Sequence, residues 1–365
     1  MKIAVFFGGK SVEHEVSVVS GIQVCKTLML EHEVIPVYIT KDNKFYYEKD
    51  MYNLDFYIDN KFNKKCFLSL NKNDSPYLEF NTFPFRKIEF DIALLCVHGD
   101  GVEDGTLASL FDFYDIPYIG PNKFSSCVAQ NKYYCKKILK NFNIDVIDYE
   151  IIRKESYKED ELIKIEKLGY PMILKANNLG SSIGIEVVNN IDELKDGLDY
   201  IFKYDSEIII EKYIKNKKEY NIALFKNNDK VETSMIEEVK GEDILSYDDK
   251  YIKKRQNRIC PAEIKNSLRN KIEYNAKKIY YGLNFNSIIR IDFIYDQDDK
   301  ILYFNEVNSI PGSYANYLFK NKYTFLDLLN SLINQSIADY NEKQKLIKII
   351  DNNKIYEIKN GIKFK

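Results

Sequence analysis

The chain has 365 residues, of which 53 are basic, 55 are acidic and 45% are apolar, and its formal net charge is -2. This length suggests two or three domains of ordinary size, and this apolar fraction argues against a largely disordered protein. The near balance of charge leaves no basic footprint for nucleic acid or for an anionic membrane surface.

The sequence also gives no support for a membrane protein, a secreted protein or a zinc-binding protein. The longest apolar runs, such as residues 92–97, fit a buried strand and fall short of the roughly 18 residues that span a bilayer. Residues 1–9 are too short for a signal peptide and offer no small-residue cleavage site, so we expect a cytoplasmic protein. The six cysteines form no CxxC pair and only three histidines are present, which argues against a zinc site or a disulfide framework.

Residues 1 to about 120 alternate between apolar runs and helical periodicity, which predicts an α/β domain with a parallel sheet. The stretch 50–87 is polar, aromatic and irregular, and its pattern assigns it no regular element. The predicted elements are strands at 3–7, 34–40, 91–97 and 117–120, and helices at 16–30 and 105–114.

Two further units follow, a small helix-covered sheet over residues 121–211 and a third unit over 212–340, before a charged tail at 341–365 with no assigned function. In the first, we predict helices at 125–142 and 191–204 and strands at 172–175, 185–188 and 207–211. In the second, we predict strands at 220–225, 287–295 and 301–307, helices at 265–281 and 324–337, and a loop at 241–259. The fold class is therefore α/β, in part α+β.

Three loops carry candidate chemistry, and the first is GGKSVEHEVS at residues 8–17. It follows the first strand, at the edge where open parallel sheets bind ligands, and it lacks the GxGxxG fingerprint of dinucleotide binding. The carboxylate of Glu15 suits a substrate ammonium group. Equally, Glu13 and Glu15 suit the N-terminus of the following helix, so the loop alone leaves both interpretations open.

The second loop, residues 175–184, begins with a lysine at a strand end and continues into a Gly/Ser-rich hairpin. Backbone N–H groups, the hydroxyls of Ser181 and Ser182 and the ammonium of Lys175 together suit phosphates. The loop is not a P-loop, and by itself it is better explained as an ordinary flexible hairpin.

The third candidate is Asp292 on one predicted strand together with Glu306 and Asn308 on the next. Side chains i and i+2 of a strand share a face, and Asp292 joins them if the strands pair. The strands are otherwise apolar, and unpaired buried carboxylates are costly. Two carboxylates and an amide oxygen suit Mg²⁺, so a metal site is favoured over a solvated strand face.

Taken in order, these motifs resemble the ATP-grasp ligases and, within them, the D-alanine–D-alanine ligase family. The resemblance spans roughly residues 1–335. Each motif alone is weak evidence, but all of the motifs occurring in the order found in the family is specific. The motifs are GGKSVEHEVS, VHGDGVEDG, LKANNLGSSIGI, IIEKYI, SYDDKY, RIDF and NEVNSIPGS. The resemblance implies an ATP-grasp fold of three α/β domains with the active site between them, and ligation of two D-alanines through an acyl phosphate for peptidoglycan precursor synthesis.

The resemblance also assigns roles to residues of this chain. For the first D-alanine, Glu15 is expected to hold the ammonium group within a network that includes Ser181 and Tyr251. His98 is expected to lie near the carboxylate of this first D-alanine. Tyr317 is expected to lie near the carboxylate of the second D-alanine. For ATP, the expected residues are Lys132, Lys175, Ser181, Ser182 and Lys250 at the phosphates, Glu211, Lys212, Tyr213 and Ile214 at adenine, and Glu219 at ribose. Arg290 and the Gly312 amide are expected to form the oxyanion hole, and Asp292, Glu306 and Asn308 to bind two Mg²⁺ ions, with Mn²⁺ as a possible substitute. Relatives are commonly homodimers, so a homodimer is expected.

This sequence departs from the family pattern at a few positions: Val102 replaces a glycine, Ala176 a proline, Asn131 an aspartate, and residues 313–317 the usual T-S-H-S segment. The last change puts Tyr317 where a serine normally meets the second substrate. A D-alanine–D-serine or D-alanine–D-lactate ligase is therefore an alternative, although Tyr251 favours an amine nucleophile over lactate. A non-catalytic nucleotide-binding protein is a further alternative, against which the retained lysines, arginine and metal ligands argue.

Overall fold

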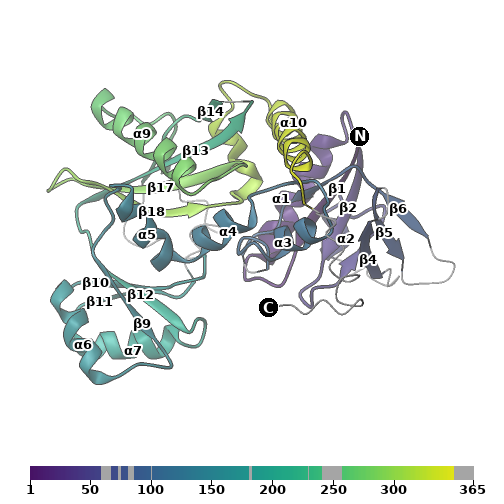
Figure 1. Ribbon diagram of the computed structural model, residues 1–365. Coiled ribbons are helices and arrows are strands. Elements are labelled where there is room, and N and C mark those ends of the chain that lie inside the picture. The colour runs from purple at the N-terminus through teal and green to yellow at the C-terminus, as the bar shows by residue number, and fades with distance from the viewer. Residues whose placement is uncertain are drawn as a thin grey trace, which may run out of the picture.

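The structure is a computed structural model that describes residues 1–58, 67–72, 75–80, 86–99, 101–180, 183–228, 230–240 and 257–348. Within these residues the strands form three sheets, of eight, four and six strands. Figure 1 shows the sheet of residues 1–120 on one side and the other two stacked on the opposite side.

The N-terminal sheet has the strand order β6-β5-β4-β3-β2-β1-β7-β8. Strands β2, β1, β7 and β8 run parallel, as the alternating pattern predicts. The remaining strands, between residues 45 and 89, form an antiparallel extension, and β4 and β5 of this extension lie in the stretch 50–87 to which the sequence pattern assigned no regular element. The elements are β1 (Lys2–Gly8), α1 (His14–Leu28), β2 (Glu33–Ile39), β3 (Phe45–Tyr46), α2 (Asp55–Ile58), β4 (Phe67–Lys72), β5 (Pro76–Phe80), β6 (Lys87–Glu89), β7 (Ile92–Leu95), α3 (Thr106–Phe113) and β8 (Tyr118–Ile119).

Strand β1 is apolar throughout because both of its faces are buried. Val5 and Phe7 pack with helix α1 on one face. Phe6 lies on the other face with Phe111 of α3. This two-sided burial is typical of parallel strands, and it fixes the loop after Gly8 at the carboxyl edge of the sheet.

The central sheet is small and antiparallel, with the order β11-β10-β12-β9. Helix α7 packs Leu194, Leu198 and Ile201 into the core of this sheet, over β10 and β11. The side chain of Asn190 caps α7 by accepting hydrogen bonds from two backbone N–H groups. The elements are β9 (Tyr149–Arg153), α6 (Glu159–Ile165), η1 (Glu166–Leu168), β10 (Met172–Ala176), β11 (Ile185–Val188), α7 (Ile191–Ile201) and β12 (Glu207–Lys212).

The third sheet has the order β16-β15-β13-β17-β18, with β14 beside β13. Helix α9 covers one face through Ile272, Ala276 and Ile279, which recur at helical spacing. Helix α10 packs Leu328 and Leu332 into a core shared with the N-terminal sheet. The elements are β13 (Lys217–Asn227), β14 (Lys230–Thr233), β15 (Glu237–Lys240), β16 (Asn257–Ile259), α9 (Asn266–Gly282), β17 (Ile289–Asp296), β18 (Leu302–Asn308), η2 (Gly312–Leu318) and α10 (Phe325–Gln344).

The helix predicted at 125–142 is two helices, α4 (Lys123–Gln130) and α5 (Lys132–Asn141). Asn131 is extended rather than helical, and its side chain accepts a hydrogen bond from the N–H of Tyr134, so it caps the second helix. Both helices pack into the core of the third sheet, although their sequence position grouped them with the central unit.

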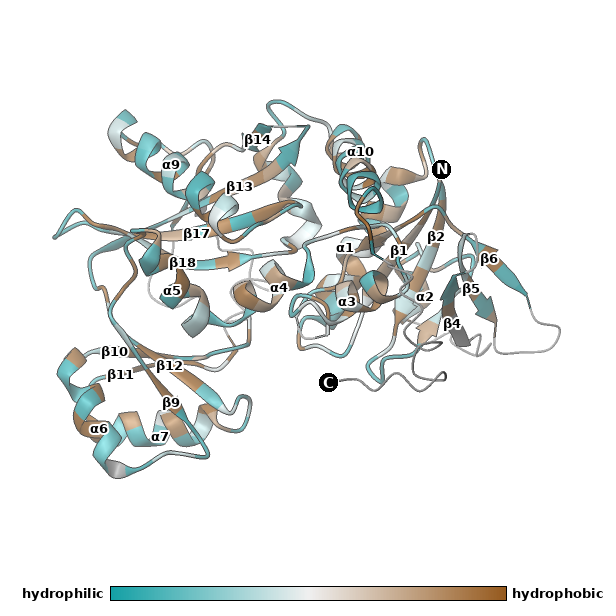
Figure 2. Cartoon of the chain, viewed as in Figure 1, coloured by the Kyte–Doolittle hydropathy of each residue, from teal (hydrophilic) through white to brown (hydrophobic). Residues whose placement is uncertain are grey.

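Figure 2 shows hydrophobic residues along central strands such as β1 and β12, whereas the outer strands β6 and β14 and the helices carry many hydrophilic residues. The mixed α/β class is confirmed. Among the helices in the described ranges, none is long and apolar enough to cross a membrane.

Candidate active site

A cavity of about 380 Å³ lies where the three sheets meet. Its lining comes from the loop before α1, the loop after β7, the central strands β10 and β12, and the strand pair β17–β18. It gathers most of the residues to which the sequence assigns chemistry: His98, Lys132, Lys175, Glu211, Lys212, Tyr213, Ile214, Glu219, Arg290, Asp292, Glu306, Asn308, Gly312 and Tyr317.

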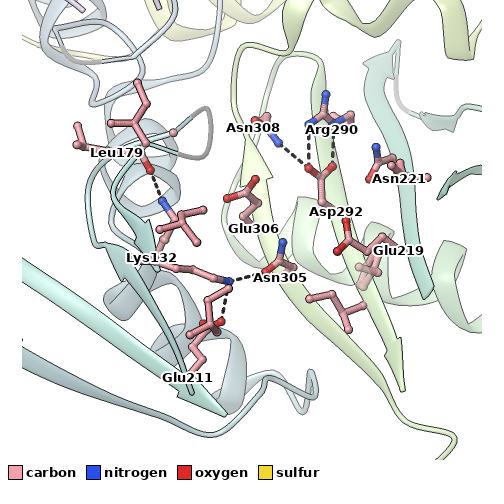
Figure 3. A pocket seen from close by; sticks show the side chains of 18 of the residues that line it. Lys132, Leu179, Glu211, Glu219, Asn221, Arg290, Asp292, Asn305, Glu306 and Asn308 are labelled. Carbon is pink, nitrogen blue, oxygen red and sulfur yellow. Dashed lines mark hydrogen bonds and ion pairs between the residues drawn. The ribbon is translucent and has the colours of Figure 1, made fainter. Parts of the chain in front are cut away.

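Strands β17 and β18 form the wall that carries the predicted metal ligands. Asp292 pairs directly with Glu306. Beyond this pair the register shifts, because Phe293 faces Phe304 and leaves Asn305 as an extra residue. Such a bulge redirects side chains, so the consecutive residues Asn305 and Glu306 both line the cavity, as Figure 3 shows.

Arg290 lies on the same wall and forms a two-pronged ion pair with Asp292. Its Nε donates to Oδ1 at 2.7 Å and its Nη2 to Oδ2 at 2.8 Å. Asn308 Nδ2 donates to Oδ2 of the same carboxylate at 3.2 Å (Figure 3). The guanidinium is therefore held in a fixed orientation at the cavity wall.

The donor set on this wall suits a hard divalent cation. Two carboxylates and one amide oxygen are the ligand types that Mg²⁺ prefers beside phosphate. Within the described residues there is no group of three His, Cys, Asp or Glu side chains suited to a metal. A metal site on this wall therefore requires the amide oxygen of Asn308 in addition to the carboxylates of Asp292 and Glu306. These three side chains are compatible with Mg²⁺.

The opposite wall, from β10, β12 and α5, is cationic. Lys175 Nζ donates to Glu211 Oε2 at 2.7 Å and to Asn305 Oδ1 at 3.0 Å. Lys136 lies on the far side of the same carboxylate, 2.8 Å from Oε1. Burial by itself would raise the pKa of Glu211, but the two lysines outweigh it and hold the pKa at about 2. Glu211 is thus ionised, and both of its carboxylate oxygens contact lysines.

A further lysine and the residues at the end of β12 complete this end of the cavity. Lys132 Nζ donates to the carbonyl of Leu179 (Figure 3), and burial lowers its pKa. Lys212 and Tyr213 follow on the chain from Glu211, and their N–H groups donate to other backbone carbonyls. Glu219 on β13 accepts from Lys217 at 2.9 Å. The roles assigned to these residues at the phosphates, adenine and ribose stay predictions.

The part of the cavity that is lined by the N-terminal domain is rich in carboxyl groups. Glu13, His98 and Glu103 all line it. Burial, reinforced by the nearby charge of Glu13, raises the pKa of Glu103 to about 8. Glu103 accepts hydrogen bonds from the N–H groups of Gly99 and Ile310, at 2.7 and 3.3 Å. Burial also lowers the pKa of His98, whose Nε2 lies 3.2 Å from the hydroxyl of Ser20.

The structure corrects the assignment of Glu15. Helix α1 begins at His14, so Glu15 lies in its first turn, where it is exposed and lines only a separate outer hollow. Glu13 precedes the helix and lies against the loop of Gly180, where an added Cβ would come within 3.3 Å of its carboxylate. Of these two glutamates, Glu13 is therefore the one that lines the main cavity, and the motif GGKSVEHEVS alone does not distinguish them.

Gly312 begins a tight turn that holds its backbone at the cavity. Residues 313–315 all adopt positive φ, between 47° and 53°, which is uncommon for side chains other than glycine. Buried contacts hold this conformation: the hydroxyl of Tyr314 donates to the carbonyl of Leu95 at 2.5 Å, and the N–H of Ser313 donates to Ser20 at 3.2 Å. A Cβ at Gly312 would meet nothing within 4 Å, so its side of the turn is open.

Tyr317 belongs to a polar cluster at the cavity rim. Its hydroxyl donates to Glu237 Oε2 at 3.0 Å and accepts from Arg258 Nη1 at 3.2 Å. Asn221 Nδ2 donates to the same Glu237 oxygen at 3.1 Å. Burial, with the charge of Glu237, raises the pKa of Tyr317 to about 12, so the phenol stays protonated.

Some assigned residues lie outside the described residues, namely Ser181, Ser182, Lys250 and Tyr251. Sequence patterns also missed functional candidates that line the cavity, namely Glu13, Glu103, Asn305 and Arg258, and Lys136, which lies behind its wall against Glu211. Of these, Glu103 lies inside the quoted VHGDGVEDG motif and Asn305 inside NEVNSIPGS. Lys136 and Arg258 carry no signal in the sequence, because only the fold brings them to the site.

The three-sheet architecture matches solved structures of one class. A D-alanine–D-alanine ligase from Helicobacter pylori aligns with a TM-score of 0.74 and 32% identity, covering 96% of this chain and 100% of that chain. The VanG D-Ala:D-Ser ligase from Enterococcus faecalis aligns with a TM-score of 0.77 and 27% identity, covering 92% of this chain and 99% of that chain. The fold and the site define an ATP-grasp enzyme, an ATP-dependent ligase.

Sequence comparisons identify the family within this class. The family models described as D-ala D-ala ligase N-terminus and C-terminus match residues 2–121 and 138–334. A D-alanine–D-alanine ligase of Thermosipho africanus is 35% identical, with 98% of this chain and 99% of the relative covered. That of Campylobacter concisus is 36% identical, with 92% of each covered. The chain belongs to the D-alanine–D-alanine ligase family.

Proposed function

We propose that this enzyme joins two D-alanines into D-alanyl-D-alanine at the expense of ATP, for the synthesis of peptidoglycan precursors. The observation that carries the proposal is the convergence of Arg290, Asp292 and Glu306 with Lys132 and Lys175 in one cavity. A phosphoryl transfer to a carboxylate needs positive charge at the phosphates and an oriented donor at the carbonyl. Both are present on facing walls.

The cationic wall supplies the nucleotide subsite. Lys132 and Lys175 hold the phosphates, Lys212 and Ile214 bind the adenine edge through their backbone, and Glu219 binds the ribose. Asp292, Glu306 and Asn308 would hold two Mg²⁺ ions, or Mn²⁺ in their place. When bound, the metal offsets the negative charge that develops on the transferred phosphoryl group.

In the first step, a carboxylate oxygen of the first D-alanine attacks the γ-phosphorus of ATP, and ADP leaves. Glu13 holds the ammonium of this D-alanine, with His98 beside its carboxylate. In the second step, the amine of the second D-alanine attacks the carbonyl of the acyl phosphate. Arg290 and the N–H of Gly312 stabilise the oxyanion of the tetrahedral intermediate, whose collapse expels phosphate.

The second D-alanine binds beside Tyr317. Arg258 donates to the Tyr317 hydroxyl and has further N–H groups for this carboxylate, in the place of a serine hydroxyl, while the one hydroxyl hydrogen of Tyr317 is donated to Glu237. Glu237 orients both of them. The likeness to a D-Ala:D-Ser ligase keeps D-serine as the second candidate for this position.

The test offers the purified enzyme ATP, Mg²⁺ and D-alanine, alone and then with D-serine or D-lactate, and measures ADP release and the mass of the product. We expect ADP release and D-alanyl-D-alanine with D-alanine alone. A mixed product that dominates when D-serine is added would favour the alternative. An absence of ADP release with D-alanine would contradict ligation.

Two further expectations accompany this function. Because ATP is the phosphoryl donor, we propose that the enzyme acts in the cytoplasm. The homodimer stays a prediction, which light scattering of the purified chain tests.

A further inference from the structure

Lys136 is a buried lysine that lies behind the cavity wall. It comes from α5, its exposed fraction is 0%, and it is absent from the cavity lining. Its ammonium lies 2.8 Å from Glu211 Oε1, 3.4 Å from the carbonyl of Phe304 and 5.7 Å from the centre of the Phe304 ring. A buried ammonium is costly unless it is paired, and Glu211 is the partner.

Glu211 therefore links two lysines that have different surroundings. One carboxylate oxygen contacts Lys136 and the other contacts Lys175, whose ammonium lines the cavity and also donates to Asn305. The three charged groups together carry one net positive charge. If Lys136 were neutral, Lys175 and Glu211 would form a neutral pair that presents no net charge to a phosphate group, and the wall would keep only the charge of Lys132.

We propose that Lys136 is a positioning residue for ATP. It compensates the charge of Glu211, so that Glu211 can fix the ammonium of Lys175 at the cavity without cancelling its charge. This inference rests on ATP as the substrate, and it assigns Lys136 no contact with the nucleotide. It acts through Glu211 and Lys175.

The test measures nucleotide binding by calorimetry in the absence of D-alanine. We expect Lys136→Met to weaken ATP and ADP binding by about tenfold or more, as the loss of a charge of this kind does in a buried site. Adenosine, which has no phosphates, should bind within about twofold of the wild-type affinity, since only electrostatic attraction to phosphate is lost. The matched control is Lys137→Met, which removes an exposed lysine of the same helix and should leave ATP binding unchanged.

A charge-balanced variant distinguishes this role from a structural one. In Lys136→Met/Glu211→Gln the net charge of the cluster is again +1, carried by Lys175 alone. We expect this double variant to recover most of the ATP affinity lost in Lys136→Met. The proposal would be overturned if the loss of ATP affinity in Lys136→Met persisted in the double variant. It would also be overturned if Lys136→Met weakened adenosine binding as much as ATP binding, or if Lys136→Met bound ATP as tightly as the wild type.

The comparison remains decisive even if Lys136→Met fails to fold. The double variant is then compared with the wild type, whose cluster carries the same net charge of +1, and the proposal requires their ATP affinities to agree within about threefold. A tenfold difference would contradict it. Since these measurements involve nucleotide alone, their failure is distinguishable from a failure of D-alanine ligation.

Discussion

Two glutamates that line one cavity have different charge states. Glu211 lies between two lysines and has a pKa of about 2, whereas Glu103 lies near Glu13 and has a pKa of about 8. Burial raises the pKa of both, so the neighbours decide the outcome. At neutral pH the first is ionised and the second is mostly protonated.

This difference divides the cavity into two chemical environments. The lysine end is suited to the phosphates of a nucleotide, and the carboxyl end is suited to the ammonium group of an amino acid. Arg290 and Asp292 lie between them on the β17–β18 wall. The division predicts that substitutions at each end affect one substrate and spare the other.

The largest effect is expected between the two ends, at Arg290. Arg290→Ala should fold normally and lower turnover by at least ~100-fold, because an oriented donor to the oxyanion is lost. Steady-state kinetics measures this, with circular dichroism as the check on folding. Near-normal turnover would remove Arg290 from the oxyanion role.

The carboxyl end is tested by a pair of matched substitutions. Glu13→Gln should raise the KM for the first D-alanine by roughly tenfold or more and leave the KM for ATP nearly unchanged, since the loss of a buried charge pair typically costs 2 kcal/mol or more. Glu15→Gln is the control, because Glu15 is exposed outside the cavity. An effect at Glu15 equal to that at Glu13 would sink the assignment.

A smaller effect is expected at the rim. Tyr317→Phe removes one hydroxyl from the cluster with Glu237 and Arg258. We expect the KM for the second D-alanine to rise about three- to tenfold, the typical worth of one hydrogen bond. The KM for the first should not change. Equal changes in both would argue against a separate subsite at Tyr317.

The smallest effect concerns stability and pH. Because the pKa of Glu103 is about 8 in the folded chain against a model-peptide value of 4.5, the folded state retains a proton that the unfolded chain releases. This contribution to stability is fully present below pH 4.5 and is lost as the pH rises through 8. Glu103→Gln should therefore show a shallower fall of Tm between pH 5 and pH 8.5, by a few °C. Parallel Tm curves for both proteins would contradict the raised pKa.

Much of the fold was predictable because its elements follow simple periodicities. Apolar runs predicted β1, β2 and β7, and helical spacing predicted α7 and α9 close to their observed bounds. The antiparallel strands between residues 45 and 89 were not predictable, because their sequence is polar and does not alternate clearly. The break at Asn131 was missed because a capping asparagine also fits the surface of one long helix.

Site residues that lie within one sequence motif could be predicted. Site residues that come together only through the fold could not be predicted. The pairing of Asp292 with Glu306 follows from two adjacent apolar strands. The bulge that turns Asn305 toward Lys175 has no local signature, and the choice between Glu13 and Glu15 depends on where α1 begins. Lys136 is one of many lysines in the sequence, and only its burial against Glu211 distinguishes it.

The central claim, that a carboxyl group is phosphorylated in this cavity, is tested most directly with D-alanine carrying ¹⁸O in its carboxylate. The account predicts that each phosphate released carries one ¹⁸O atom, since the attacking carboxylate oxygen leaves with the phosphoryl group when the peptide bond forms. Release of unlabelled phosphate together with dipeptide would contradict it.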